Sequence, residues 1–365
     1  MHPRPRPVDP RPVPPPAGIF TARVHTSTAA ACALALLLAS CGKGPAQAPA
    51  AGEGDGSSSG APAAAASTVT QPGDVFAGAV PAATGDAMTH DGTPHIVDSA
   101  AGGVHVQYRA YGRGEPLVVL IHGWSCDSNY WQAQVADLKT RYTVATVDLA
   151  GHGGSGANRT DWSMAAFGAD VAAVVEALKD HPKVVLVGHS MGGPVMVEAA
   201  RRLGPRVIGV IGVDTLKDVG LPRPPAAETA RRLAPFEKDF IGSTRAMVQS
   251  TMFTPRSDPV LMRRIVDDMS QAPPEVALPA IHGLNDWDAV TAMQSLSVPI
   301  VAINSDLGGV TDEARIRKLV PGFRLVTVTG LGHFLMMEDP ARFKPLLDAQ
   351  IRALVAAPAT PPPAS

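Results

Sequence analysis

Ser190 lies in a pattern that is typical of a reactive hydroxyl. The motif Gly-His-Ser-Met-Gly at 188–192 follows the apolar run 183–187 and precedes a stretch of small residues at 193–200. A strand, a very tight turn and a helix would place the serine hydroxyl at the tip of the turn. The two glycines of the motif allow a strained turn and a close approach of the helix to neighbouring strands. The pattern predicts a nucleophile, and the alternative is an ordinary turn that happens to contain serine.

A serine hydroxyl is a poor nucleophile at neutral pH and needs a base beside it. A histidine in a loop after a late strand can supply that base. His333 lies in such a loop, because it follows the apolar strand predicted at 323–328. His189 occupies the variable position of the turn and is expected to point away from the partner of the hydroxyl. His152 fits a role in holding its own loop by hydrogen bonds, so we expect His333 to be the base.

The third group of such a site is a carboxylate that orients the histidine and stabilises its charged form. Asp306 follows the strand predicted at 299–303, and Asp214 ends the preceding strand, so both lie at the same edge of the sheet. We favour Asp306 because its strand comes just before the one that delivers His333. Asp214 is the alternative, and Asp312 ranks third.

The oxyanion of a tetrahedral intermediate needs two preorganised backbone N–H donors. The amide of Met191 comes directly after the serine, at the start of the predicted helix, where the helix dipole also helps. The second donor is expected from Trp124, in the loop after the buried strand at 117–121. The indole of Trp124 is expected to pack under neighbouring segments, and both roles are compatible.

Buried strands alternate with helices through most of residues 95–356. Strands are predicted at 104–111, 117–121, 143–147, 183–187, 207–213, 299–303 and 323–328, and helices at 130–139, 167–178 and 342–354. Continuous apolar strands that alternate with helices form a mostly parallel sheet covered on both faces. The fold class is therefore α/β. Ligands of such sheets bind beyond the carboxyl ends of the strands.

The alternation of strands and helices stops at about 216–297. Proline-punctuated segments with helical character occupy 227–240, 243–253 and 258–269. This stretch is too long for a plain connection, and we interpret it as a cap over the strand ends. It carries large apolar side chains that predict either an apolar acyl or alcohol pocket or a small core of the cap itself, namely Met252, Phe253, Trp287 and Met293.

Residues 1–40 are typical of a targeting segment and are set apart from the fold. Arginines precede the short apolar run 29–39, which is too short to span a membrane comfortably. The run ends in Leu-Ala-Ser-Cys at 38–41, which resembles a bacterial lipobox. The resemblance implies that Cys41 is acylated and anchors the chain in the cell envelope, at the outer membrane facing the periplasm. The alternative is a soluble secreted or periplasmic protein cleaved near Ala39.

The segment 41–94 is rich in Ala, Gly, Ser and Pro, which predicts a disordered tether between an anchor and a folded domain. The tail 357–365 has a similar composition. Cys126 is the one cysteine of the predicted folded body, so an internal disulfide is not expected.

Composition argues against several classes of function. The 365 residues carry a formal net charge of −2 without a clustered basic surface, so nucleic-acid binding is not expected. The histidines lack zinc-ligand spacing with a third ligand nearby, so we expect no metal. We also expect no cofactor, and the oligomeric state stays open.

These motifs together resemble the α/β-hydrolase superfamily over about residues 95–356. The resemblance rests on His-Gly-Trp at 122–124, Asp-Leu-Ala-Gly-His-Gly-Gly-Ser at 148–155, the serine motif and Gly-His at 332–333. It implies an eight-stranded sheet with a helical cap inserted after the sixth strand, and the chain order Ser, Asp, His agrees. Relatives often carry Gly-x-x-Asp after the seventh strand, where this chain has Asn-Ser-Asp at 304–306.

The expected activity is cleavage of small-molecule carboxylic esters through an acyl-enzyme. A serine rather than an aspartate at the turn argues against dehalogenase or epoxide-hydrolase chemistry. An acyltransferase or a carbon–carbon bond hydrolase could use the same residues, because fold and triad do not define the substrate. A non-catalytic envelope binding protein is the least favoured hypothesis.

Overall fold

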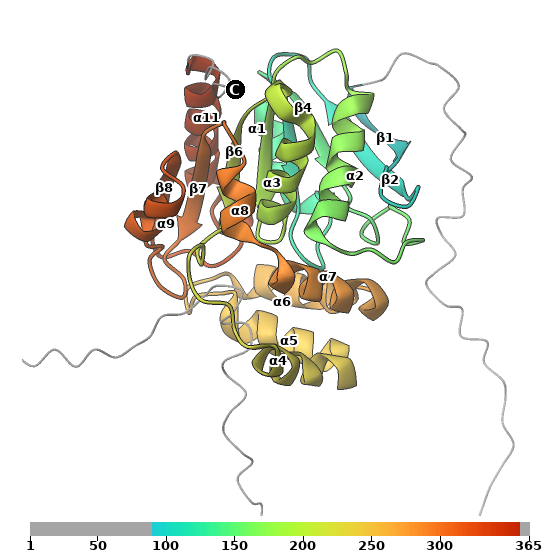
Figure 1. Ribbon diagram of the computed structural model, residues 1–365, viewed down its shortest axis with the longest axis vertical. Helices are drawn as coiled ribbons and strands as arrows, with labels where there is room; N and C mark the ends of the chain where they lie inside the picture. Colours follow the sequence, from blue (N-terminus) through green and yellow to red (C-terminus); the bar gives the residue numbers. More distant parts are fainter. Residues whose placement is uncertain (1–89, 358–365) are drawn as a thin grey trace, which may run out of the picture. The chain divides into compact units, whose positions relative to one another are not determined.

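The computed structural model describes residues 90–357. The predicted signal segment, the lipidation candidate Cys41, residues 41–89 of the predicted tether 41–94 and residues 358–365 of the predicted tail lie outside the described residues. Residues 91–94, expected to belong to the disordered tether, are instead part of the first strand, Asp91–Asp98, where they pair with the next strand. Figure 1 follows the described chain from its first strand to its last helix.

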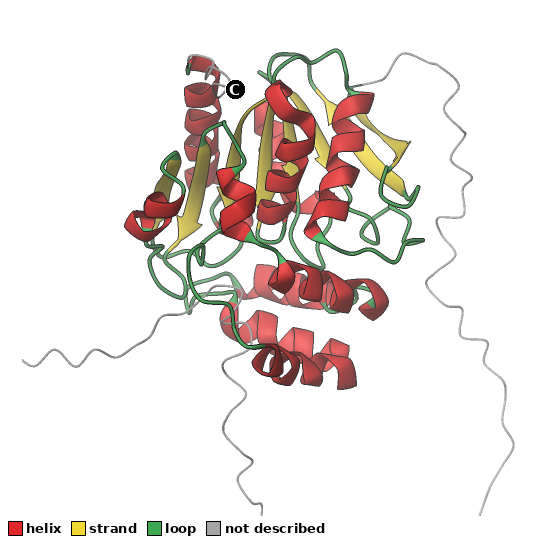
Figure 2. Cartoon of the chain, in the orientation of Figure 1, coloured by secondary structure: helices red, strands yellow, loops and turns green. Residues whose placement is uncertain are grey.

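An eight-stranded sheet forms the centre of the described chain (Figure 2). Its strands are β1 (Asp91–Asp98), β2 (His105–Tyr111), β3 (Leu117–Ile121), β4 (Thr143–Val147), β5 (Val184–His189), β6 (Val207–Val213), β7 (Ile300–Ser305) and β8 (Phe323–Val328). The order across the sheet is β1-β2-β4-β3-β5-β6-β7-β8. β1 and β2 pair antiparallel, β2 also pairs antiparallel with β4, and all other pairings are parallel. This confirms the predicted fold class.

The inner strands are apolar along their whole length because helices cover both faces of the sheet. Every residue of β3, β4, β5 and β7 is buried. The helices α2 (Met164–Ala177), α3 (Gly192–Leu203) and α8 (Ala289–Gln294) pack side by side on one face, while α1 (Gln132–Leu138) and α11 (Pro340–Ala356) contact each other (Figure 1). The short helices α9 (Glu313–Leu319) and α10 (Leu335–Glu338) flank β8 in sequence.

The cap consists of helices inserted between β6 and β7, as the fold class predicts. They are α4 (Ala226–Lys238), α5 (Phe240–Thr251), α6 (Pro259–Met269) and α7 (Pro274–Asp286), and they lie beyond one end of the strands in Figure 1. Aspartate side chains begin two of them: Asp239 accepts from the amide of Gly242, and Asp258 accepts from the amide of Val260. Between residues 90 and 357, no helix is long and apolar enough to cross a membrane.

The parallel register brings the functional candidates to one edge of the sheet. At the carboxyl ends of the strands, Ile121 pairs with Gly188, His189 with Val213, and Ser305 with Val328. The loops that carry the candidate serine, carboxylates and histidine therefore leave the sheet side by side.

Candidate active site

Ser190 occupies a strained turn between β5 and α3. Its φ of 53° lies in the left-handed region, which non-glycine residues seldom adopt. Backbone and side-chain bonds hold the turn in place: the amide of Ser190 donates to the carbonyl of Val213 at 3.0 Å, and its carbonyl accepts from Thr215 Oγ1 at 2.7 Å and from the Gly193 amide at 2.9 Å. The strain is therefore supported by the neighbouring strand β6 and its loop.

The glycines of the motif are required by packing. A Cβ at Gly192 would lie 2.6 Å from the carbonyl oxygen of His122 and 2.7 Å from that of Ile121. A Cβ at Gly188 would collide with the carbonyl oxygen of Gly192. The helix α3 thus begins in direct contact with the loop that follows β3, as expected for a turn that exposes a serine at the sheet edge.

His333 is buried and is placed by a short hydrogen bond to a carboxylate. Its Nδ1 donates to Oδ2 of Asp214 at 2.6 Å, so the bond favours the tautomer with the proton on Nδ1. Its Nε2 is buried and has no hydrogen-bond partner within residues 90–357. Nε2 is therefore a free acceptor, and His333 and Ser190 line the same cavity.

Asp214 follows β6 in a left-handed conformation, with φ of 46°. Its Oδ1 accepts hydrogen bonds from the amide and the hydroxyl of Ser305, both at 2.7 Å, and lies 2.8 Å from Nζ of Lys217. Burial by itself would raise the pKa of Asp214, but the hydrogen bond from His333 and the charge of Lys217 lower it to about 2. Asp214 is therefore a carboxylate at neutral pH.

The carboxylate beside His333 is thus Asp214, which corrects the preference for Asp306. Asp306 accepts from the amide of Gly330 at 2.8 Å, and Asp312 caps α9 through the amide of Arg315 at 2.9 Å. The physical reason is the turn after β6, which directs Asp214 toward the ring of His333, whereas Asp306 is bonded to the backbone of the same loop three residues earlier, at Gly330. Asp214 is the alternative that the sequence offers.

Besides the carboxylates of Asp214 and Asp306, several other groups bond to the loop that carries His333. Its amide donates to the carbonyl of Met252 at 2.8 Å, and its carbonyl accepts from Nε2 of His189 at 3.0 Å. His189 therefore does not point away from the histidine loop as expected, because its ring lies 4.7 Å from the His333 ring. Burial lowers the pKa of His189 to about 3, so it donates as a neutral ring. Glu338 accepts from the amides of Gly332 and Phe334.

The backbone amides predicted to bind an oxyanion lie beside the serine. A Cβ at Gly123 would be 3.0 Å from Cβ of Ser190, which places the peptide that leads to Trp124 against the nucleophile. Met191 precedes α3 and follows the serine directly. The amides of Trp124 and Met191 donate no hydrogen bond to another group of residues 90–357.

Side chains near the site attach the cap to the sheet domain. Trp124 donates from Nε1 to the carbonyl of Ala277 in α7 at 2.8 Å. Tyr130 donates its hydroxyl to Asp268 in α6 at 2.6 Å. The sequence predicts packing for the indole of Trp124 and an oxyanion role for its amide; the indole is bonded to the cap, and the role of the amide stays a prediction.

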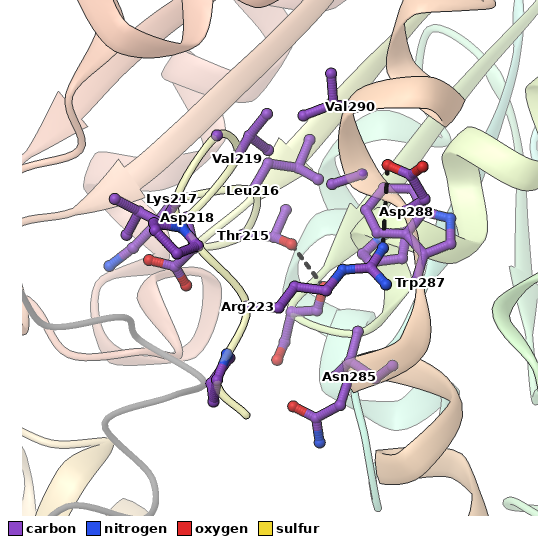
Figure 3. Close-up of a pocket in the computed structure, with 18 of the residues that line it drawn as sticks. Thr215, Leu216, Lys217, Asp218, Val219, Arg223, Asn285, Trp287, Asp288 and Val290 are labelled. Carbon is purple, nitrogen blue, oxygen red and sulfur yellow. Dashed lines mark hydrogen bonds and ion pairs between the residues drawn. The ribbon is translucent and has the colours of Figure 1, made fainter. Parts of the chain in front are cut away.

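A cavity of about 230 Å³ opens over Ser190, Asp214 and His333. Figure 3 shows the loop from Thr215 to Arg223 on one side and the segment Trp287–Val290 on the other. Across the cavity Arg223 lies 4.0 Å from Asp288. Apolar atoms supply most of the lining surface, with side chains of Leu216, Val219, Leu221, Leu284, Trp287 and Val290. Polar or charged side chains also contribute to the lining, among them Lys217, Asp218, Thr229, Arg232 and Asn285.

Of the apolar cap residues singled out in the sequence, Trp287 alone lines this cavity. Met252, Phe253 and Met293 are buried in the hydrophobic core. Cys126 is a buried free thiol whose Sγ contacts the carbonyl of Trp124 at 3.3 Å.

Two further buried histidines support loops instead of joining the site. His122 accepts from the amide of Leu149 at 3.0 Å through Nε2, and His152 bonds the carbonyl of Ala150 through Nδ1. Burial lowers the pKa of both rings, that of His152 to about 3. In the described part of the chain, no group of His, Cys, Asp and Glu side chains could hold a metal ion.

Comparison with known proteins agrees with the architecture. The sequence profile of the Alpha/beta hydrolase family matches residues 118–346, from β3 into α11. This match spans more than half of the chain and includes the serine turn and the histidine loop. The chain therefore belongs to the alpha/beta hydrolase family.

Its relatives include esterases. An uncharacterized protein of Mycobacterium tuberculosis is 30% identical over 65% of this chain and 75% of its own length. A pimeloyl-[acyl-carrier protein] methyl ester esterase of Vibrio campbellii is 29% identical over 56% of this chain and 81% of its own length. Among solved structures, a thermophilic esterase from Thermogutta terrifontis has a TM-score of 0.63 and 25% identity, covering 72% of this chain and 98% of the esterase.

Proposed function

We propose that this protein is a serine hydrolase that cleaves small carboxylic esters through an acyl-enzyme. The observation that carries the proposal is the state of His333. Its Nδ1 is bonded to the buried carboxylate of Asp214, and its Nε2 is left unpartnered in a cavity that Ser190 also lines. A neutral imidazole held in this way is a general base with its acceptor nitrogen available.

In the proposed reaction, His333 Nε2 takes the proton of the Ser190 hydroxyl as the serine oxygen attacks the ester carbonyl carbon. The resulting imidazolium is stabilised by Asp214, and it returns the proton to the leaving alcohol when the carbon–oxygen bond breaks. Water then attacks the acyl-enzyme by the same route, giving the free acid and restoring Ser190. Every proton is returned, so no cofactor is needed.

The negative oxygen of each tetrahedral intermediate would be bound by the amides of Trp124 and Met191. The amide of Met191 follows Ser190 directly, and Gly123, which precedes Trp124, lies against Ser190. Neither amide donates to another group of residues 90–357. Preorganised backbone donors contribute more to the transition state than to the ground state, because the charge develops only as the bond forms.

The cavity and the relatives support an ester as the substrate. Its mainly apolar lining suits an alkyl or aryl part of an ester, and its volume of about 230 Å³ suits a small molecule. The relatives that are named as esterases act on ester bonds, which agrees with this chemistry.

A fluorophosphonate probe tests the proposal directly, because it reacts with activated serines. We expect the folded protein to be labelled at Ser190 and to hydrolyse at least one member of a p-nitrophenyl ester series from acetate to palmitate. S190A should lose both the labelling and the ester hydrolysis, whereas S295A, a control at an exposed serine, should retain the labelling and the hydrolysis. Folded protein that is neither labelled nor active would refute the proposal.

The location of the protein is a separate proposal, which rests on the sequence around Cys41. We propose acylation of Cys41 and anchoring at the bacterial outer membrane, facing the periplasm. Labelling with radioactive palmitate should occur in the full chain and be lost in C41A. Equal labelling of both proteins, or none in either, would contradict lipid attachment at this residue.

A further inference from the structure

We propose that Lys217 is a positioning residue of this site, which acts through Asp214 to control the charge and orientation of the group that holds His333. The inference rests on the proposed function and adds a residue to it. Neither the serine motif nor the histidine loop points to this lysine. Its role follows from its burial and its contacts.

The ammonium group of Lys217 is enclosed by acceptors. Its side chain is 6% exposed, and Nζ lies 2.8 Å from Oδ1 of Asp214. Nζ also donates to the carbonyl of Ser305 at 3.2 Å, to the hydroxyl of Ser305 at 3.3 Å and to the carbonyl of Leu307 at 3.2 Å. A buried charge is stable only when it is paired and hydrogen-bonded, and Lys217 meets both conditions.

The backbone is shaped to deliver this side chain. Asp214 and Leu216 both have left-handed conformations, with φ of 46° and 57°, so the chain turns sharply between the carboxylate and the lysine. Arg315 on α9 holds the far side of the turn, because it donates to the carbonyl of Lys217 at 2.7 Å and to that of Val219 at 3.1 Å. Strained residues persist only where surrounding bonds support them, which indicates that the placement of Lys217 is built into the fold.

The division of contacts on Asp214 explains the orientation of its carboxylate. Oδ1 is occupied by Lys217 and by the two donors of Ser305, while Oδ2 accepts from His333. A carboxylate held on one oxygen by three donors has little freedom to rotate. Oδ2 therefore stays aimed at Nδ1 of the histidine.

The charge of Lys217 also opposes the positive charge that forms on His333. The other groups that face His333 do not compensate for this effect: His189 is neutral, and Glu338 is bound to the backbone on either side of the histidine and to Ser257. Arg315 donates to the carbonyls of Lys217 and Val219, and Asp306 accepts from the amide of Gly330 in the histidine loop. Loss of the lysine charge should therefore make His333 easier to protonate, because Asp214 would act with its full negative charge.

Two variants separate the charge of Lys217 from its other contributions. K217M keeps much of the length of the side chain without charge or donor, and K217R keeps the charge. The exposed Lys179 provides the matched control K179M. For each protein, kcat and KM for a responsive ester would be measured from pH 5 to 9, with the melting temperature as a check on folding. K217Q, which keeps a donor without the charge, replaces K217M if that variant does not fold.

In K217M we expect the midpoint of the acid limb of the kcat/KM profile to move to higher pH by about half to one pH unit. We also expect kcat of K217M to fall while its KM stays nearly constant. K217R, which keeps the charge, should have the pH profile of the wild-type protein. If the acid limb stays in place or moves to lower pH in the variant that folds, K217M or its replacement K217Q, the inference is overturned. A merely structural role would lower the melting temperature without moving this limb.

A second readout does not depend on turnover. The proton on Nδ1 of His333 should give a low-field NMR signal, and its titration midpoint should rise in K217M by the same amount as the kinetic limb. Wild-type protein without esterase activity would refute the proposed function. A wild-type titration that is unchanged in K217M would refute only the role of Lys217.

Discussion

The backbone amide of His333 donates a 2.8 Å hydrogen bond to the carbonyl oxygen of Met252. Met252 ends α5, so the candidate base is attached to the cap as well as to the sheet domain. Glu338 strengthens this attachment, because it accepts from the Ser257 hydroxyl at 2.6 Å and from the amide of Gly332 beside the histidine. The position of the cap and the position of the base are therefore coupled.

Removing one link of this attachment should weaken catalysis more than binding. We expect S257A to lower kcat by up to about tenfold, because a hydrogen bond to a carboxylate contributes about 1.5 kcal/mol or more. KM should change little. The control is S250A, since the hydroxyl of Ser250 bonds only within α5. Equal kcat values for S257A and S250A would contradict the coupling.

The two candidate carboxylates can be distinguished by replacing each with its amide. D214N should lower kcat by about three to four orders of magnitude, because the amide cannot hold the charged form of His333. D306N should stay within about threefold of wild type, since asparagine retains an acceptor for the Gly330 amide. Circular dichroism should show both variants folded. A large loss in D306N alone would reverse the assignment.

The buried histidines should make the folded state sensitive to acid. Burial lowers the pKa of His152 and His189 to about 3, whereas histidine in an unfolded chain titrates near 6.5. Below pH 6.5 the unfolded chain binds more protons, so each ring removes about 1.4 kcal/mol of unfolding free energy per pH unit until about pH 3. Asp214 has a pKa of about 2, so its protonation lowers the free energy of unfolding further as the pH falls from about 4 to about 2.

Urea denaturation at several pH values between 6 and 4 checks this slope. H152N keeps a donor for the carbonyl of Ala150 but cannot be protonated, so its stability should fall less steeply by about 1.4 kcal/mol per pH unit. H282N is the control, because His282 is exposed. Parallel slopes for H152N and wild type would show that His152 does not contribute to acid sensitivity.

The packing around the serine turn should tolerate no side chain at Gly192. We expect G192A to lose about 3 kcal/mol or more of stability, since its Cβ would press on two backbone carbonyl groups that cannot move independently. G322A is the matched control, because nothing lies within 4 Å of a Cβ at Gly322. Thermal unfolding measures both. A melting temperature of G192A close to that of G322A would show that the elbow can relax.

Much of the sheet could be predicted because its inner strands are continuous apolar runs with short connections. The strands at 117–121, 143–147, 207–213 and 323–328 have the bounds predicted from the sequence. β1 received no strand prediction of its own. Its residues Asp91–Asp98 include Gly, Thr and Pro, and none of them is fully buried, so they carry no apolar periodicity.

The site was harder to predict where geometry decides between similar residues. Asp214 and Asp306 both follow strands at the same edge, and spacing alone does not say which carboxylate faces the histidine. The choice depends on a left-handed turn and on the donors of Ser305 and Lys217. The sequence feature that favours Asp214 is a lysine three residues after it, because a nearby positive charge stabilises a buried carboxylate. The contact between His189 and the His333 carbonyl joins residues 144 positions apart and left no pattern in the sequence.

Trp124 belongs to the sheet domain but is bonded to both parts of the molecule. Gly123, which precedes it, lies against Ser190, and the indole of Trp124 donates to Ala277 in α7. The cap is therefore not an exchangeable module. Grafting a cap from a relative to change substrate preference would also have to reproduce an acceptor at the place of the Ala277 carbonyl, or the loop beside the nucleophile would lose an anchor.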